Sequence, residues 1–135
     1  MRDNTKMTTQ QAQDLTPPQT PDGATVHRDL AYVPNGHERQ KLDLYLPGGG
    51  TDVPLIIWIH GGAFLKGSKE DGVPLDYLDA GYALASINYR LSQHDLFPAQ
   101  IEDCKAAVRW LRAHAQEYGL ARIAVGRLVR YHPGV

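Results

Sequence analysis

The chain has 135 residues, 42% of them hydrophobic, and its 15 acidic and 14 basic residues leave a formal net charge of -1. This length predicts one domain, and the balanced charge argues against a nucleic-acid partner or an anionic membrane surface. The single cysteine excludes an internal disulfide framework and a multi-cysteine metal site, and the six histidines lack ligand spacing. No signal peptide or membrane-spanning run follows the start, so we expect a cytoplasmic protein. We also expect neither a cofactor nor a metal.

Residues 1–24 consist largely of Thr, Gln, Asp and Pro, with few large aliphatic side chains. Such a segment buries too little apolar surface to offset its ordering entropy, so we predict a disordered leader.

The first structured segments are predicted to pair as a hairpin. Residues 26–33 mix apolar and polar side chains like an outer strand, and Pro34-Asn35-Gly36 supplies turn chemistry. Residues 41–46 alternate strictly between polar and apolar side chains. We therefore expect an antiparallel hairpin at a sheet edge, with Leu42, Leu44 and Leu46 facing the core.

The most informative stretch is the apolar run 54–59, which stops at His60-Gly61-Gly62-Ala63-Phe64. A short unbroken apolar run of this kind predicts a buried strand of a parallel sheet. Ligands bind beyond the carboxyl ends of such strands, and glycines there let backbone N–H groups approach a substrate atom. This is how an oxyanion hole is built, although a plain glycine turn between strand and loop is the alternative.

The next elements alternate between helix and strand. A polar loop at 66–69 precedes a short helix at about 74–80, which Gly81 is expected to end, and residues 82–89 read as a second buried strand. The clearest helix is predicted over 98–118, with an apolar stripe at Ile101, Cys104, Val108, Leu111, Ala115 and Tyr118.

A third buried strand is expected to begin at Arg122, whereas residues 126–135 show neither strand nor helix periodicity. This order of elements predicts an α/β fold, with a mostly parallel sheet flanked by helices.

Three ordered blocks carry a family resemblance, namely residues 59–64, 87–92 and 97–111. They resemble the amino-terminal half of an α/β-hydrolase, and more narrowly the feruloyl-esterase-like and hormone-sensitive-lipase-like esterases. The resemblance covers about residues 25–125. It implies a partial α/β-hydrolase fold, hydrolysis of a carboxylic ester through a serine ester intermediate, and a small-molecule ester as substrate.

The resemblance also implies roles for individual residues. The N–H groups of Gly62 and Ala63 would hold the oxyanion of the tetrahedral intermediate, and Gly61 would make the turn. His60 would order this loop, as a structural imidazole, because the family supplies the triad histidine much later in the chain. Arg90 and Asp103 match positions suited to a buried structural ion pair, and two solvated charges are an equal alternative.

The sequence departs from the family at the nucleophile. A Gly-x-Ser-x-Gly elbow is expected directly after the strand that begins at Arg122, and it is absent from the sequence. The only serines are Ser68, Ser86 and Ser92, none of them in such an elbow. Cys104 as a substitute nucleophile is less favoured than a buried structural cysteine, because it lies on the predicted apolar face of a helix.

We therefore predict an esterase or lipase of the α/β-hydrolase class that is truncated or frameshifted and inactive as it stands. A non-catalytic binding module or receptor-like pseudoenzyme of the same fold is the alternative.

Residues 126–135 are interpreted as an aberrant tail. If the codons of residues 126–130 are GGG CGC CTC GTC CGG, losing the first base would give Gly-Ala-Ser-Ser-Gly, which is a nucleophile elbow. The acyl and alcohol specificity and the oligomeric state are not predicted.

Overall fold

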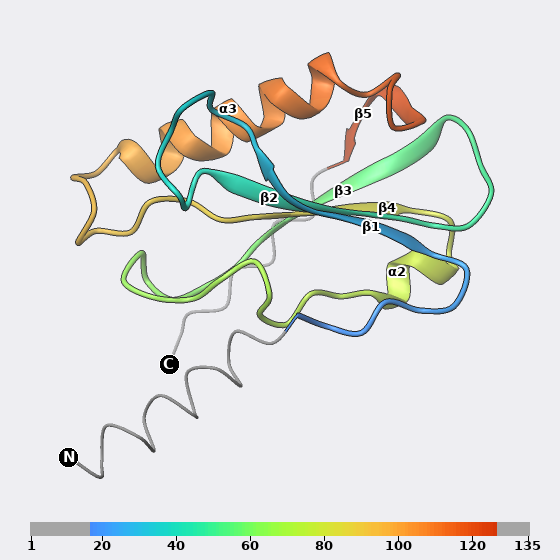
Figure 1. Ribbon diagram of the computed structural model, residues 1–135, viewed down its shortest axis with the longest axis horizontal. Coiled ribbons are helices and arrows are strands. Elements are labelled where there is room, and N and C mark those ends of the chain that lie inside the picture. The colour runs from blue at the N-terminus through green and yellow to red at the C-terminus, as the bar shows by residue number, and fades with distance from the viewer. Residues whose placement is uncertain (1–16, 127–135) are drawn as a thin grey trace, which may run out of the picture.

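The computed structural model of the protein describes residues 17–126, with side chains described as far as residue 121. Most of the predicted leader and nearly all of the predicted aberrant tail lie outside this range. Residues 17–24 contain no helix or strand. The described chain forms one five-stranded mixed sheet with the order β1-β2-β4-β3-β5 (Figure 1). No helix in the described range is long and apolar enough to span a membrane.

The predicted hairpin is confirmed at the edge of this sheet. Strand β1 (Thr25–Ala31) pairs antiparallel with β2 (Lys41–Leu46), and β2 pairs antiparallel with β4. Leu42 and Leu44 are fully buried, and Leu46 packs against the same core while partly buried. The register shifts between His27 and Leu30, where Asp29 has a φ of 57°. This bulge brings the Asp29 N–H to the Asp43 carboxylate on β2.

The two apolar runs form the centre of the sheet, as predicted. Strand β3 (Val53–Ile59) pairs in parallel with β4 (Ala83–Ile87) on one side and with β5 (Leu120–Gly126) on the other. All five residues of β4 are buried. A strand covered on both faces needs no polar alternation, which explains why β3 is apolar throughout and Ser86 is the one polar residue of β4.

The helices lie on opposite faces of the sheet (Figure 1). Helix α3 (Ala99–Ala113) covers the larger apolar cluster, to which β2, β3, β4 and β5 contribute, whereas α2 (Asp76–Asp79) covers a smaller one. Strand β4 lies on one side of β3 and β5 on the other, so the two crossovers run in opposite directions. Right-handed crossovers in opposite directions place their helices on opposite faces, as observed.

Helix α3 corrects the prediction in two ways. It ends at Ala113 instead of Tyr118, because residues 114–119 fold into turns that close with a hydrogen bond from Leu120 N–H to the Ala115 carbonyl. The predicted stripe is confirmed in part, since Leu111 and Ala115 are buried and Val108 and Tyr118 pack partly buried against the core, but Ile101 is 40% exposed. The helix residues that are buried are Ala99, Gln100, Asp103, Ala107 and Leu111. Small alanine side chains let the helix approach the sheet closely, and the polar residues find partners there.

Candidate active site

The turn after β3 has an unusual backbone. Gly62 has a φ of 125°, and Ala63 and Phe64 follow with φ values of 55° and 62°. A Cβ atom on Gly62 would lie 2.1 Å from the carbonyl oxygen of Lys66, so only glycine fits there. Positive φ at two consecutive non-glycine residues is uncommon and strained, and such strain concentrates at functional sites.

Hydrogen bonds to two carbonyl groups fix the direction of the neighbouring N–H groups. The Gly61 carbonyl lies 2.8 Å from His60 Nδ1, and the Gly62 carbonyl accepts from the N–H groups of Leu65 at 2.9 Å and Lys66 at 3.3 Å. In a planar trans peptide the C=O and the following N–H point in opposite directions. The N–H groups of Gly62 and Ala63 therefore point away from the interior of the loop.

These two N–H groups are available to a ligand. Within residues 17–126, neither Gly62 nor Ala63 donates its N–H to any acceptor. Gly62 is buried and Ala63 is exposed. Adjacent donors that are held in place and left unused at the end of a parallel strand form the arrangement that stabilises a developing oxyanion.

His60 is held on every side by the protein. It is 3% exposed, its ring stacks on Tyr89 at 4.5 Å between centroids, and its carbonyl accepts from the Tyr89 hydroxyl at 3.0 Å. Burial lowers the pKa of His60 to about 4, and the nearby Arg39 charge adds to this effect. The imidazole is therefore neutral at pH 7. Because Nδ1 faces a carbonyl, Nδ1 carries the proton and Nε2 is the acceptor.

Arg39 supplies the partner for that acceptor, and the sequence analysis did not find it. Its Nη2 lies 3.3 Å from His60 Nε2 and donates to the Gly67 carbonyl at 3.0 Å, while its Nε donates to the Tyr89 carbonyl at 2.8 Å. Arg39 lies in the connection between β1 and β2, far from the turn in sequence. Arg39 is recognised only by its contacts with three acceptors in the folded protein. No local sequence pattern reveals these contacts.

The loop predicted at 66–69 is present, and a buried lysine anchors it. Lys69 is 4% exposed and its Nζ lies 2.9 Å from Asp29, 3.0 Å from Asp43 and 2.8 Å from Glu70. Burial alone would lower the pKa of Lys69, but the hydrogen bonds that its ammonium donates to these carboxylates outweigh it and raise the pKa above its ordinary value. Lys69 therefore stays charged and ties the loop to the hairpin.

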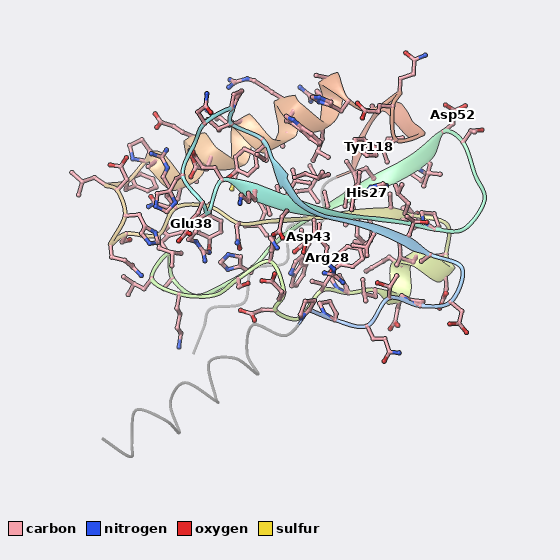
Figure 2. All side chains as sticks on the ribbon, in the orientation of Figure 1. His27, Arg28, Glu38, Asp43, Asp52 and Tyr118 are labelled. Atoms are coloured by element: carbon pink, nitrogen blue, oxygen red, sulfur yellow. The ribbon has the colours of Figure 1, made fainter. Side chains whose placement is uncertain are left out.

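Asp43 is the fully buried member of this group, and Arg28 provides it with a second cation (Figure 2). Arg28 Nη1 lies 3.5 Å from Asp43 Oδ2, and the N–H of Asp29 donates to Asp43 Oδ1 at 2.8 Å. The bulge in β1 brings this N–H to the carboxylate. A buried carboxylate with two cations and a backbone donor is satisfied, which is the condition for burying a charge.

Arg90 and Asp103 lie together on the other side of the site. Arg90 Nη2 and Asp103 Oδ1 are 2.8 Å apart, and the Arg90 N–H donates to Oδ2 at 2.9 Å. Gln40 Nε2 also donates to Asp103, at 2.8 Å. Burial would raise the pKa of Asp103, but these hydrogen bonds hold it below its ordinary value. The carboxylate joins the segment after β4 to α3 and to the β1–β2 connection.

Apolar side chains surround the exposed edge of the turn. Phe64 contacts Tyr89 and Phe97, with ring centroids 5.9 and 6.3 Å apart. The Phe64 carbonyl accepts from the Ser92 N–H at 2.7 Å, which brings the two loops together. The exposed apolar side chains at or beside the turn are Phe64, Leu65 and Phe97.

None of the three serines has the geometry of an activated nucleophile. Ser86 is fully buried and donates to the Lys69 carbonyl, while Ser68 is buried and donates to Glu70. Ser92 is exposed, and in the described part of the chain no serine hydroxyl bonds to a histidine. Cys104 is partly buried, and burial raises the pKa of its thiol to about 12, so it is no thiolate at neutral pH.

Similar proteins and structures identify the family and the fold of this chain. The model of the BD-FAE family matches residues 42–126. The chain belongs to the BD-FAE family. Among curated relatives, it is 37% identical over 119 residues to Esterase LipI of Mycobacterium tuberculosis, with 73% of this chain and 37% of LipI covered. Carboxylic Ester Hydrolase LipN of the same organism is 39% identical over 112 residues, covering 77% of this chain and 30% of LipN.

Solved structures place the same fold in esterases. The truncated form of a carbohydrate esterase from gut microbiota matches with a TM-score of 0.77 and 31% identity, over 84% of this chain and 42% of that chain. Esterase B from Lactobacillus rhamnosis matches with a TM-score of 0.74 at 21% identity, over 96% of this chain and 42% of that chain. The described residues therefore form part of an α/β-hydrolase fold of the esterase type.

Proposed function

We propose that this chain carries the oxyanion-binding part of a carboxylic ester hydrolase, and that the N–H groups of Gly62 and Ala63 hold the oxyanion of the tetrahedral intermediate. The observation that carries the proposal is the pair of N–H groups, aimed away from the loop and unused by any acceptor in residues 17–126. The esterase relatives support the choice of an ester as substrate.

In this proposal His60 is a positioning residue. Its Nδ1–H holds the Gly61 carbonyl, and that carbonyl fixes the direction of the Gly62 N–H through their shared peptide plane. The neutral ring cannot serve as a source of positive charge at pH 7. An apolar acyl or alcohol group of the ester would lie against Phe64, Leu65 and Phe97, which are exposed beside the turn.

We also propose that the 135 residues alone do not complete the reaction. Their three serines lie outside any Gly-x-Ser-x-Gly elbow, and Ser68 and Ser86 are buried. Acyl transfer needs a nucleophile with an adjacent base in addition to the oxyanion hole. A fluorophosphonate probe is expected to leave the chain unlabelled, and hydrolysis of a short activated ester is expected to equal the blank. Stoichiometric labelling at Ser68, Ser86 or Ser92 would contradict this part.

A separate experiment tests the oxyanion site without a nucleophile. The anion of methyl butylphosphonate imitates the charge and tetrahedral shape of the intermediate, and it is titrated into the ¹⁵N-labelled full chain. We expect the amide proton resonances of Gly62 and Ala63 to move downfield together, because both would donate to the same oxygen. Unchanged resonances at these two positions, or shifts spread evenly over the chain, would overturn the assignment.

Two glycine variants provide a matched comparison. Gly67 and Gly81 have φ values of 99° and 88°, so an alanine at either position strains the backbone similarly. A Cβ atom at Gly67 would lie 2.4 Å from the Gly61 oxygen, whereas one at Gly81 would meet nothing within 4 Å. We expect Gly67→Ala to abolish the phosphonate-induced shifts and Gly81→Ala to retain them.

A further inference from the structure

Arg39 contacts both ends of the turn that follows β3. Its Nη2 lies 3.3 Å from His60 Nε2, where the turn begins, and donates to the Gly67 carbonyl at 3.0 Å, where the turn ends. A guanidinium nitrogen of this kind carries a pair of hydrogens in one plane, so Nη2 can serve both acceptors at once. Arg39 therefore joins the two ends of the turn without belonging to it.

The other end of the guanidinium is fixed by Tyr89. Arg39 Nε donates to the Tyr89 carbonyl at 2.8 Å. The Tyr89 ring stacks on His60, and its hydroxyl donates to the His60 carbonyl at 3.0 Å. The guanidinium and the imidazole are therefore held relative to each other through Tyr89 as well as by their direct contact.

The backbone that carries Arg39 is also held in place. The Arg39 N–H donates to His37 Nδ1 at 3.0 Å, and the Gln40 N–H donates to the His37 carbonyl at 2.9 Å. The Tyr32 N–H donates to the Gln40 carbonyl at 3.1 Å, and the Gln40 side chain donates to Asp103 on α3. The connection between β1 and β2 thus presents Arg39 from a fixed backbone, which reduces the entropy lost in placing its side chain.

The chemistry of the guanidinium selects one form of His60. A guanidinium offers only N–H donors, so the ring nitrogen that faces it must offer a lone pair. The proton of the neutral ring is then left on Nδ1, which lies 2.8 Å from the Gly61 carbonyl. A second proton on Nε2 would point at the guanidinium and bring two positive charges together. Arg39 therefore favours the neutral ring that donates to Gly61.

The contact with Gly67 acts on the same ring from the other side. A Cβ atom at Gly67 would lie 2.5 Å from His60 Nδ1 and 2.4 Å from the Gly61 oxygen, so the backbone here is in close contact with both groups. Displacement of Gly67 would disturb the bond between His60 and Gly61. By holding the Gly67 carbonyl, Arg39 maintains this close packing.

We propose that Arg39 is a positioning residue of the oxyanion site. It donates to His60 and Gly67 and thereby holds the turn in one conformation. That conformation aims the N–H groups of Gly62 and Ala63 away from the loop, toward a substrate. The inference rests on the proposed function and extends it to the connection between β1 and β2, which lies outside the glycine motif of the turn.

Two variants that remove the same charge provide the main test. Arg39→Met removes the donors, and Arg109→Met removes a guanidinium from an exposed position on α3. Methyl butylphosphonate is titrated into each ¹⁵N-labelled full chain, and the amide resonances of Gly62 and Ala63 are followed. We expect Arg39→Met to weaken phosphonate binding by about tenfold or more and Arg109→Met to bind like the parent chain. Undiminished binding by Arg39→Met, or equal losses in the two variants, would overturn the proposal.

Arg39→Lys separates geometry from charge. Lysine keeps the positive charge, but its ammonium lacks the planar fork that reaches His60, Gly67 and Tyr89 together. We expect Arg39→Lys to lose most of the phosphonate affinity. Full affinity in this variant would show that the charge is sufficient and would overturn the positioning role. Arg39→Lys is also the milder change, so it decides the question if Arg39→Met does not fold.

The ring nitrogens of His60 give a readout that needs no phosphonate. In the parent chain we expect a pyrrole-like ¹⁵N resonance for Nδ1 and a pyridine-like one for Nε2. In Arg39→Met we expect the Nε2 resonance to move toward the pyrrole-like position, because no donor then requires a lone pair there. An unchanged His60 pattern would overturn the role of Arg39. A changed pattern without any phosphonate response in the parent chain would contradict the proposed function and leave Arg39 as the residue that positions the turn.

Discussion

His60 is a buried side chain that the protein holds at both ring nitrogens and along one face of the ring. Its ring is stacked on Tyr89, its Nδ1–H is committed to the Gly61 carbonyl, and its Nε2 accepts from Arg39. Every polar atom of the ring is used, so the imidazole has no free position for a substrate proton. The same bonds orient the N–H of Gly62, and this is why a histidine at this position stabilises the turn.

The first residue-scale prediction concerns pH. Burial depresses the folded-state pKa of His60 to about 4, below its ordinary value of 6.5, so the unfolded chain binds the proton more tightly. The stability contributed by neutral His60 is complete above about pH 6.5 and is lost as pH falls toward 4, by at most about 1.4 kcal/mol per pH unit. Denaturant titrations at a series of pH values measure this slope.

His60→Gln provides the comparison, since glutamine does not titrate and can still bond to the Gly61 carbonyl. We expect the variant to show a shallower fall in the free energy of unfolding between pH 6.5 and pH 4. Parallel pH profiles for the two proteins would mean that the folded-state pKa of His60 is close to its ordinary value, which would contradict the prediction.

At the scale of elements, Asp103 connects three parts of the chain. Its carboxylate receives bonds from Arg90 after β4, from Gln40 before β2, and lies itself on α3. The structure thereby places a polar residue on the sheet-facing side of the helix. This arrangement accounts for part of the difference between the buried face of α3 and the predicted stripe.

Two aspartates that pair with the same arginine allow a matched test of this connection. Arg90 also pairs with Asp95 through Nη1 at 2.9 Å, where the Asp95 side chain is 50% exposed, against 2% for Asp103. We expect Asp103→Ala to lower the free energy of unfolding by about 3 kcal/mol, because a buried pair is broken. For Asp95→Ala we expect a loss below about 1 kcal/mol, since the pair is solvated. Urea denaturation of both variants compares them, and equal losses would contradict the structural role of Asp103.

At the scale of the molecule, the sheet is unevenly supported. Strand β4 lies between β2 and β3 and is buried throughout, whereas in the described sheet β5 pairs with β3 alone. Local opening is easiest where contacts and pairing are fewest. The stability of the described domain should therefore decline from β4 toward β5.

Native-state hydrogen exchange measures this gradient in the full chain. We expect the amides of β4 to exchange only through global unfolding and those of β5 to exchange much faster, through local opening of the edge. Equal protection of β4 and β5 in the isolated chain would contradict the uneven support.

The sequence by itself determined the elements and the turn that carries the proposed function. Apolar runs predicted the two central strands, alternation predicted the hairpin, and two glycines after 54–59 marked the turn that we propose to hold the oxyanion. These signals are local, because each depends on side chains and backbone conformations within a few residues.

Only the tertiary structure decided how polar residues are buried and which face of α3 packs on the sheet. Periodicity predicted the stripe at Ile101 and Cys104, yet the helix packs through Ala107 and Asp103, since small side chains allow close approach and Arg90 satisfies the carboxylate. No local sequence pattern marks Lys69 as buried or Arg39 as partly buried. Their partners lie far away along the chain, and burial of a charge depends on partners that only folding brings together.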